Sequence, residues 1–428
     1  MVFISGIIAE LNAQRVDLYE AIGIALERNY DVRTANFSRE IAENNAEAGN
    51  AGYYPSLFLN GQGSYSSQDT ELNFASPEQP NISADGASTL NYGASANLEY
   101  LVFNGGRRLH IYRQFQYLSE DGRLRERLEM ESTALQVSSN FLEALRLLEL
   151  QNIDQLSVEL SLDRLTRARE NYNYGNTTRL QVLNAEVDLR TDSINLANSS
   201  LDYQNSLRRL YLNMGIPADT LIKLDTAFTF SELMNREEIL NSALNKNTIY
   251  LRTRNAEATA NESLKAAEGN LWPTISANAA YQYNYSDFEA NFISTQENFG
   301  WTAGLNLRFN IFDGRNIRRN IENARLEADI AEVEAEKSQN QVVQVVNNAY
   351  DTYITNLQLL KISERNLDLA ETNFERSEEA FATGQITGVE LRTAQLNLSE
   401  AMNAISRQRV ITKISELALL FEAGMLIE

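Results

Sequence analysis

The chain carries an internal duplication, and this repeat limits the folds that are open to it. Tyr54-Pro55-Ser56 returns as Trp272-Pro273-Thr274, and Phe103-Asn104-Gly105 returns as Phe312-Asp313-Gly314. The offset between the copies is about 218 residues at the first run and about 209 at the second, so the length difference falls between the two runs. Because insertions concentrate in loops, a loop is expected there.

Residues that alternate between apolar and polar predict two strands in each copy. From 275 to 285 every second residue is apolar, and the same holds from 301 to 311. A period of two is typical of a strand, and about eleven residues is the length of a tilted transmembrane β-strand. The first copy shows the pattern less cleanly, because Phe58 lies on the polar face. We predict strands at about residues 55–66, 90–103, 273–285 and 300–312.

Aromatic residues gather near the ends of the predicted strands, where a membrane protein carries its interfacial girdle. The candidate girdle residues are Tyr54, Trp272, Tyr283, Tyr285, Trp301 and Phe309. Four strands in one sheet leave two open edges, whose unpaired backbone groups cannot face lipid. If the strands lie in a membrane, other copies of the chain must complete them, giving about 8, 12 or 16 strands for two, three or four chains.

Two proline-free stretches, about residues 107–172 and 315–383, predict helices that would each be nearly 100 Å long at about 1.5 Å per residue. The helix after the first stretch has apolar rows at seven-residue spacing on two opposite sides. One row is Val182, Leu189, Leu196, Tyr203 and Leu210, and the other is Leu180, Val187, Ile194 and Leu201. A helix with two apolar seams packs between two neighbours, which favours a tube of helices over a coiled-coil dimer.

Composition limits the function as well. The net charge of −21 argues against a nucleic-acid partner, and no run of about 18 apolar residues predicts a transmembrane helix. The absence of cysteine excludes a disulfide, a thiolate metal site and a cysteine nucleophile. The single histidine, His110, is interpreted as a side chain at the end of a strand, and no phosphate-binding motif is present. We expect no enzyme activity, no cofactor and no metal.

Taken together, the duplicated features resemble the TolC-type outer-membrane efflux protein family over nearly the whole chain. The resemblance is carried by Asn29 and Asn247, residues 54–56 and 272–274, 102–106 and 311–314, the glycines Gly175 and Gly384, and residues 180–185 and 389–394. It implies an α plus transmembrane β fold. Three copies would form a 12-stranded β-barrel in the outer membrane, continuous with a long periplasmic α-helical barrel.

The domain organisation follows from the duplication. Residues 1–13 are a possible residual export signal, because they are apolar at first but lack a preceding basic segment. Repeat 1 covers about residues 14–217 and repeat 2 about residues 236–428, with a connecting equatorial segment at about 218–235.

The resemblance also implies a function and partners. The protein would be a passive exit duct for efflux or type I secretion, located in the outer membrane of a Gram-negative bacterium. A periplasmic adaptor (membrane fusion) protein would couple it to an inner-membrane RND or ABC pump. The expected docking tips are Gly175, Asn176, Thr177, Gly384, Gln385 and Ile386. Two alternatives remain open at this point: an acidic coiled-coil scaffold and a self-sufficient porin.

The resemblance places a periplasmic gate after the second tip glycine. In the family, acidic side chains narrow the entrance there, and the matching residues in this chain are Glu390 and Thr393. The positions of the family's polar latch read Phe381, Ile386 and Gln181, which cannot form it. We therefore predict a gate held by apolar contacts, whose conductance responds little to salt-bridge disruption, and three Glu390 carboxylates that raise one another's pKa.

Overall fold

The structure is a computed structural model that describes residues 15–73, 81–218, 220, 222–231, 235–291 and 293–427. The possible export signal at residues 1–13 lies outside the described residues. The chain divides into two compact units. Unit 1 contains residues 1–39, 123–253 and 335–428, and unit 2 contains residues 40–122 and 254–334. Each unit draws on both sequence repeats, so the duplication does not correspond to two separate domains.

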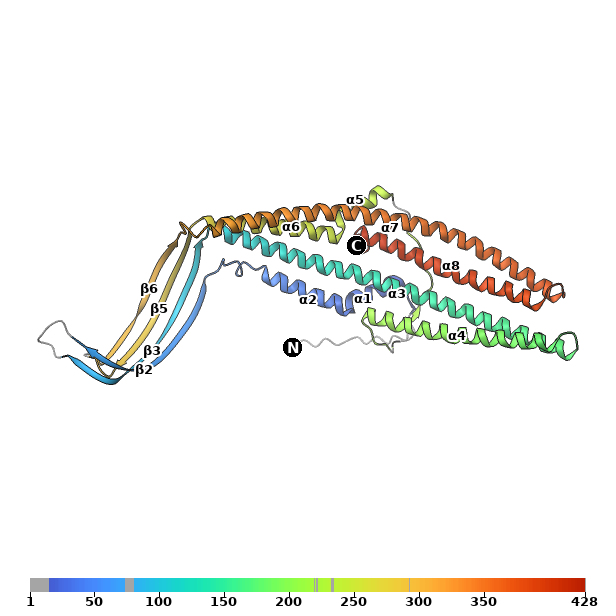
Figure 1. The fold of residues 1–428 in the computed structure, drawn as a ribbon, viewed down its shortest axis with the longest axis horizontal. Helices are drawn as coiled ribbons and strands as arrows, with labels where there is room; N and C mark the ends of the chain where they lie inside the picture. The colour runs from blue at the N-terminus through green and yellow to red at the C-terminus, as the bar shows by residue number, and fades with distance from the viewer. Residues whose placement is uncertain are drawn as a thin grey trace. The chain divides into compact units, whose positions relative to one another are not determined.

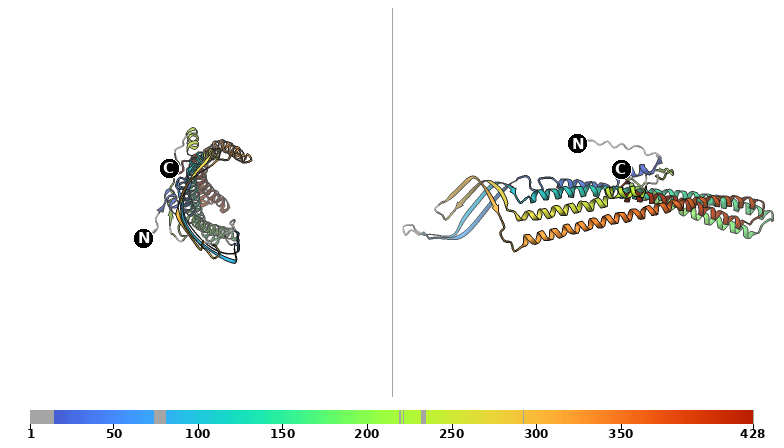
Figure 2. Two further views of the ribbon diagram at one scale, coloured as in Figure 1. Left: turned by 90° about the vertical axis from the view of Figure 1, so that its left-hand side faces the viewer. Right: turned by 90° about the horizontal axis from the view of Figure 1, so that it is seen from above.

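Unit 2 contains a four-stranded antiparallel sheet, drawn as a curved layer in Figures 1 and 2. Its strands are β2 (Ser56–Leu72), β3 (Ile82–Phe103), β5 (Thr274–Phe288) and β6 (Thr295–Arg308), in the order β2-β3-β5-β6. The strands extend further into the hairpins than the alternation predicts. Pairing continues to Leu72 with Ile82 and to Asp287 with Thr295, so the loops are shorter than the expected 66–90 and 286–300.

The strand register gathers the apolar residues on one face of the sheet. Leu57 lies opposite Leu98, Leu98 opposite Ala279, and Ala279 opposite Ala303. Because neighbouring residues in register point to the same side, the alternating apolar residues of all four strands share a face. The other face carries mainly Asn, Gln, Ser, Thr and Gly, and its apolar exceptions include Phe58, as expected, and Leu101.

Four long helices follow the strands in pairs. They are α3 (Arg107–Asn173) with α4 (Arg179–Met214), and α7 (Asn316–Ala382) with α8 (Gly388–Glu422). The bounds of α3 and α7 agree closely with the two helices predicted at about residues 107–172 and 315–383. The helix α7 begins one residue later than predicted, because Arg315 has a left-handed backbone with φ of 66°. None of the helices in the described ranges is long and apolar enough to cross a membrane.

Within unit 1 the long helices lie in the order α4-α3-α8-α7. The Ser161 hydroxyl of α3 donates to Asp192 of α4, and the hydroxyls of Ser157 and Ser399 join α3 to α8. Thr412 of α8 donates to the carbonyl of Asn356 on α7 at 3.2 Å. The helices α4 and α7 are therefore the two outer members of the layer.

The breaks between the shorter helices explain why the two repeats share an asparagine. These helices are α1 (Leu18–Arg28), α2 (Tyr30–Asn45), α5 (Arg236–Lys246), α6 (Thr248–Glu268) and the short 3-10 helix η1 (Gly269–Leu271). Asn29, between α1 and α2, donates to the carbonyl of Asn213 at 2.8 Å. Asn247, between α5 and α6, donates to the carbonyl of Glu422 at 2.9 Å. Each asparagine thus ties a helix break to the end of α4 or α8.

The connecting segment is attached to unit 1 by backbone and buried polar contacts. Its strand β4 (Lys223–Leu224) pairs in parallel with β1 (Arg15–Val16). Lys413 of α8, which is 1% exposed, donates to the carbonyl of Thr229 at 2.7 Å and to Glu416 at 2.8 Å. Glu416 also accepts from the backbone N–H of Ser231 at 3.1 Å. A buried charge pair with these additional hydrogen bonds fixes the path of the segment.

Candidate functional site

The two helix hairpins end in the same backbone turn. Gly175 and Gly384 have φ of 79° and 75°, the left-handed conformation that favours glycine. At the first turn, the N–H of Asn176 bonds to the carbonyl of Asn171 at 2.8 Å. At the second, the N–H of Gln385 bonds to the carbonyl of Ala380 at the same distance. Both are Schellman motifs, so the predicted docking tips present equivalent loops.

Glu390 caps the start of α8 together with Thr387, in a capping box. Its carboxylate accepts from the backbone N–H of Thr387 at 2.7 Å and from the Thr387 hydroxyl at 2.9 Å. These two hydrogen bonds lower the pKa of Glu390, although the small desolvation of the group acts in the opposite direction. The predicted mutual rise of pKa among three copies therefore starts from a carboxylate that the chain itself keeps ionised. The capping box gives this glutamate a structural role at the helix start, and its role in a gate stays a prediction.

The other predicted gate residues lie close to the same turns. Thr393 is exposed and its hydroxyl donates to the carbonyl of Val389 one turn earlier, at 3.1 Å. Gln181, the repeat-1 counterpart of Glu390, is also exposed and accepts from the Thr177 hydroxyl. Ile386 is half-buried in its turn. The capping box therefore exists in repeat 2, whereas the N-cap Thr178 of repeat 1 makes no side-chain cap bond.

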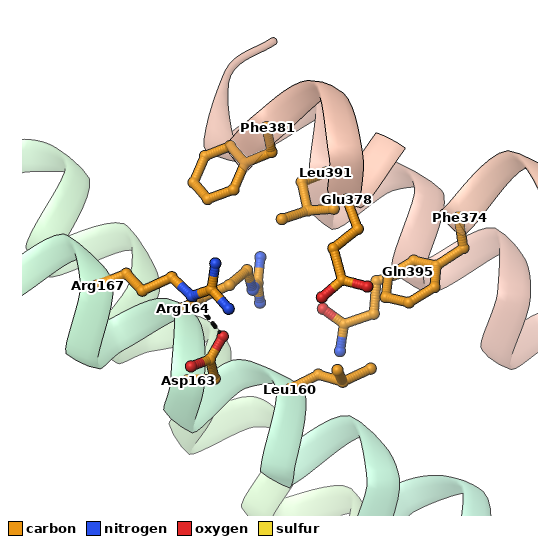
Figure 3. Close-up of a pocket in the computed structure, with 9 residues that line it drawn as sticks. All are labelled: Leu160, Asp163, Arg164, Arg167, Phe374, Glu378, Phe381, Leu391 and Gln395. Atoms are coloured by element: carbon orange, nitrogen blue, oxygen red, sulfur yellow. Dashed lines mark ion pairs between the residues drawn. The ribbon is translucent and has the colours of Figure 1, made fainter. Parts of the chain in front are cut away.

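Phe381 lies in a pocket between helices of both repeats, shown in Figure 3. The pocket is lined by Leu160, Asp163, Arg164 and Arg167 of α3, Phe374, Glu378 and Phe381 of α7, and Leu391 and Gln395 of α8. Phe381 and Leu391 lie near each other on one side of the opening, and Arg164 and Arg167 lie on the other. The predicted gate residue Phe381 thus borders a cleft whose opposite wall carries two arginines.

A polar network beside this pocket was missed by the sequence reasoning. Arg392 of α8 forms two hydrogen bonds to Asp192 of α4, at 2.8 and 2.7 Å. Arg164 of α3 pairs with Asp188 of α4 at 3.3 Å, and Ser161 donates to Asp192. We call these five residues, from both repeats, the repeat-bridging network. Its member Arg392 lies only two residues after Glu390. Charged contacts are therefore present beside a gate that the sequence predicts to be apolar.

The candidate girdle residues do not all lie at strand ends. Tyr54 and Trp272 precede β2 and β5 by two residues and are 68% and 63% exposed, and Phe309 directly follows β6. Trp301, in contrast, lies opposite Tyr281 in the middle of the hairpin. The reason is that β6 begins at Thr295, well before the predicted start.

Tyr283 and Tyr285 lie nearer the hairpin end of β5. Tyr285 is stacked on Tyr92 of β3 with ring centroids 4.7 Å apart. Tyr283 is tilted against the same ring at 6.5 Å. These three aromatic side chains come from the apolar alternation of two neighbouring strands, so they form a cluster on the apolar face.

His110 has a specific partner that its sequence context did not indicate. Its Nδ1 lies 2.7 Å from a carboxylate oxygen of Glu262 on α6, which also pairs with Lys265 at 2.8 Å. These contacts join the start of α3 to α6. Among the residues that the structure describes, no group of three or more His, Asp or Glu side chains could hold a metal ion.

The outer helices of unit 1 expose apolar rows. On α4 the row Leu180, Val187, Ile194 and Leu201 is between 53% and 66% exposed, whereas the opposite row packs within the chain. On α7, Leu359, Ile362 and Leu369 are 43%, 61% and 68% exposed. In unit 2 the outer strands β2 and β6 each have one unpaired edge. Each layer therefore has two edges, of which one belongs to repeat 1 and the other to repeat 2.

Comparisons with known proteins agree with this architecture. The sequence profile of the family described as Outer membrane efflux protein matches residues 21–215 and again residues 239–424. No curated protein matches the sequence.

Solved structures of bacterial channels share the fold. The Campylobacter jejuni CmeC outer membrane channel is 15% identical, with a TM-score of 0.80 covering 96% of this chain and 86% of that chain. The outer membrane protein VceC from Vibrio cholerae is 14% identical, with a TM-score of 0.76 and coverage of 95% and 96%. The open state of the Neisseria gonorrhoeae MtrE outer membrane channel is 18% identical, with a TM-score of 0.69 and coverage of 95% and 89%.

Proposed function

The chain belongs to the outer membrane efflux protein family, and from that premise we propose that three copies of it close into one channel that is served by a periplasmic adaptor and an inner-membrane pump. The protein is an outer-membrane efflux channel of the TolC type, with a periplasmic helical extension, and is not an enzyme. Channels of this family form trimers. Family membership replaces the scaffold and the self-sufficient porin as explanations of the chain.

The observation that supports closure between copies is the pair of edges on each layer, and the family supplies the number three. An unpaired strand edge cannot face lipid, so β6 of one copy needs a partner, and β2 of the next copy supplies an edge of the same sheet. The exposed apolar row of α4 needs to be covered in the same way, and the exposed row of α7 in the next copy, which is also apolar, would cover it. Three copies give twelve strands and twelve long helices.

The mass of the detergent-solubilised particle tests this proposal directly. We expect three copies of the 48.3-kDa chain after correction for bound detergent. A particle of any other stoichiometry would refute the architecture.

The adaptor is proposed to bind the two tips of each chain. Support comes from the equivalent Schellman turns at Gly175 and Gly384, which would give six similar loops around a trimer. Tyr174, next to the first glycine, is 81% exposed and provides an apolar contact surface. A photo-reactive residue at Gln385 should cross-link to an adaptor in whole cells. The same residue at Arg376, on the exposed side of α7, should not, and equal labelling at both positions would contradict the docking site.

Acidification is expected to leave the charge of the proposed Glu390 ring intact until well into the acid range. The Thr387 hydrogen bonds hold the pKa of Glu390 below its ordinary value of 4.5, so the carboxylate is ionised above that value and is protonated only as the pH falls through the lowered pKa. Cation selectivity of the channel in bilayers should therefore stay constant from about pH 8 to about pH 5.

Two variants serve as controls for this titration. Glu390→Gln removes the ring of carboxylates, so the cation selectivity that the ring provides should be lost at every pH. Thr387→Val removes the hydroxyl donor and should shift the loss of selectivity to higher pH. A decline of wild-type selectivity above pH 5 would show that repulsion among the three carboxylates outweighs the hydrogen bonds.

The apolar residues of the second tip are expected to contribute to closure. Phe381 packs over Gly388, where a β-carbon would lie 3.8 Å from the ring, so truncation of this half-buried side chain removes apolar contacts at the turn. The double variant Phe381→Ala with Ile386→Ala should raise the resting conductance in bilayers several-fold. Unchanged conductance would rule out an apolar contribution to the gate.

A further inference from the structure

The repeat-bridging network joins the first turns of α8 to both helices of the other hairpin. Arg392 lies two residues after Glu390 and contacts Asp192 through both of its terminal nitrogens. Its Nε lies 3.9 Å from Asp188, one turn earlier on α4. The side chains of Arg392 and Asp192 are 13% and 5% exposed, so this contact is largely removed from water.

The network is complete in charge and in hydrogen bonds around Asp192. Two arginines, Arg164 and Arg392, face two aspartates, and Ser161, which is fully buried, donates to Asp192. Arg164 is 9% exposed and its Nε has no hydrogen-bond partner. Figure 3 shows Arg164 at the pocket that Phe381 borders. The network and the predicted apolar gate residues thus meet around one cleft.

Such a network defines a position more than it adds stability. A buried ion pair contributes little net free energy compared with an apolar replacement, because desolvation offsets the attraction. Loss of one partner, however, leaves a buried charge without compensation. The bidentate geometry of an arginine with a carboxylate also fixes both distance and orientation. The contact therefore specifies one placement of α8 against α4 and α3.

The seam that continues along α3 and α8 is polar as well. Gln395 donates to the carbonyl of Ser157 at 3.3 Å, the hydroxyls of Ser157 and Ser399 are 3.2 Å apart, and Ser406 donates to Glu149. Hydrogen bonds of this kind contribute little net free energy, because water can bond to the same groups when the helices separate. Leu391 and Leu398 of the same half of α8 are buried as well, but apolar contacts of this kind set no particular orientation. The charged network is therefore the contact that fixes how the tip half of α8 is oriented against the other hairpin.

We propose that the repeat-bridging network is a pin that holds the tip half of α8 in the resting position of the channel, with Arg392 as its central positioning residue. The inference rests on the proposed function, since a resting position has meaning for a gated channel. It also changes the expectation from sequence, because disruption of this salt bridge should alter conductance. Opening of the entrance would require Arg392 to leave Asp192, so that α8 separates from α4 and α3.

The first experiment measures resting conductance of the purified trimer in planar bilayers without adaptor. Arg392→Leu should raise the leak at least about tenfold, the factor that corresponds to about 1.4 kcal/mol. Arg392→Lys keeps the charge but loses the bidentate contact and should give a smaller rise. Asp192→Asn combined with Arg392→Leu should leak no more than the worse single variant, because both changes remove the same contact. The matched control is Arg376→Leu, which removes an arginine from an exposed pair with Glu379 and should leave the leak unchanged.

The second experiment replaces the pin by a covalent bond. The chain has no cysteine, so Ser157→Cys with Ser399→Cys introduces a single defined pair between α3 and α8. In the Arg392→Leu background, oxidation of this pair should lower the leak to the wild-type level. Reduction with dithiothreitol should then bring the raised leak back. The bond forms when two thiols lose two electrons and two protons to an added oxidant such as copper phenanthroline.

Thermal dissociation of the trimer separates positioning from folding. If Arg392→Leu lowers the thermal stability but leaves the resting conductance at the wild-type level, the network is a structural tie and the pin is refuted. A leak that persists after oxidation of the cysteine pair would refute it as well. A wild-type protein that is not a trimer or forms no channels would overturn the proposed function, and the pin with it.

Discussion

Replacement of Ile194 by aspartate is expected to prevent assembly while leaving the single chain folded. Ile194 is 61% exposed in the chain and lies in the middle of the apolar row on α4. In the proposed ring this row is covered by the neighbouring copy, so the aspartate would be buried without a counter-ion. Such a burial costs several kcal/mol, about 3 or more, and a ring of three copies contains the change at every interface. The fraction of trimer should fall by at least about tenfold.

Asn195→Asp provides the matched control for this prediction. It introduces the same carboxylate on the same helix, but residue 195 points about 100° away from residue 194 and lies outside the apolar row. Size-exclusion chromatography with light scattering in detergent should find trimers for Asn195→Asp and monomers for Ile194→Asp. Circular dichroism of both variants should retain the helical content. Trimers of Ile194→Asp would show that the α4 row faces something other than a second copy.

The fold could be predicted from sequence because its periodic features are local. Alternation at 275–285 and 301–311 predicted strands whose apolar faces the register confirms as far as Arg308, where β6 ends four residues before the predicted end. The two long helices were predicted to within a residue or two of their ends. The hairpin ends of the strands were missed for a physical reason. Beyond Tyr65 the residues on both faces are polar, as in Ser67 and Gln68, so alternation disappears although backbone pairing continues.

The candidate site was only partly predictable, because its charged contacts join residues far apart in the chain. Arg392 and Asp192 are separated by 200 positions, and no spacing rule relates them. One signal was available on α4. Asp192, Ser199 and Ser206 are all buried. They lie three or four residues from leucines of the packed row, at the position of each heptad that points inward. Polar residues at these positions indicate a polar seam, which the apolar rows alone conceal.

The repeated asparagines and glycines were recognised as matching, but their role required the structure. Gly215 follows α4 and Gly424 lies just beyond α8, with φ of 68° and 67°. A β-carbon on Gly215 would lie 2.4 Å from the carbonyl oxygen of Arg28, and one on Gly424 would lie 2.4 Å from that of Lys246. These are the residues directly before Asn29 and Asn247. Close backbone contact explains why both repeats have glycine here.

Gly424→Ala is therefore expected to destabilise the chain strongly. The left-handed backbone costs an alanine about 1 kcal/mol, and the collision with backbone atoms of residues 246 and 247 adds about 1–3 kcal/mol, because neither can move without breaking the Asn247 contact to Glu422. Gly215→Ala should have a similar effect through Arg28 and Asn29. Urea unfolding of the detergent-solubilised protein, followed by circular dichroism, should show a loss of about 2–4 kcal/mol for each variant.

Gly106→Ala separates backbone strain from collision. Gly106 also has a left-handed backbone, with φ of 78°, but a β-carbon there would meet nothing within 4 Å. This variant should lose only the conformational part, about 1 kcal/mol. If Gly424→Ala and Gly106→Ala were equally destabilised, the close approach of α8 to the Lys246 carbonyl would not be part of the folded protein. If Gly215→Ala and Gly424→Ala both destabilise the protein more than Gly106→Ala, the two repeats share the same stabilising contact. In that contact an asparagine binds the end of the long helix and a glycine permits its close approach.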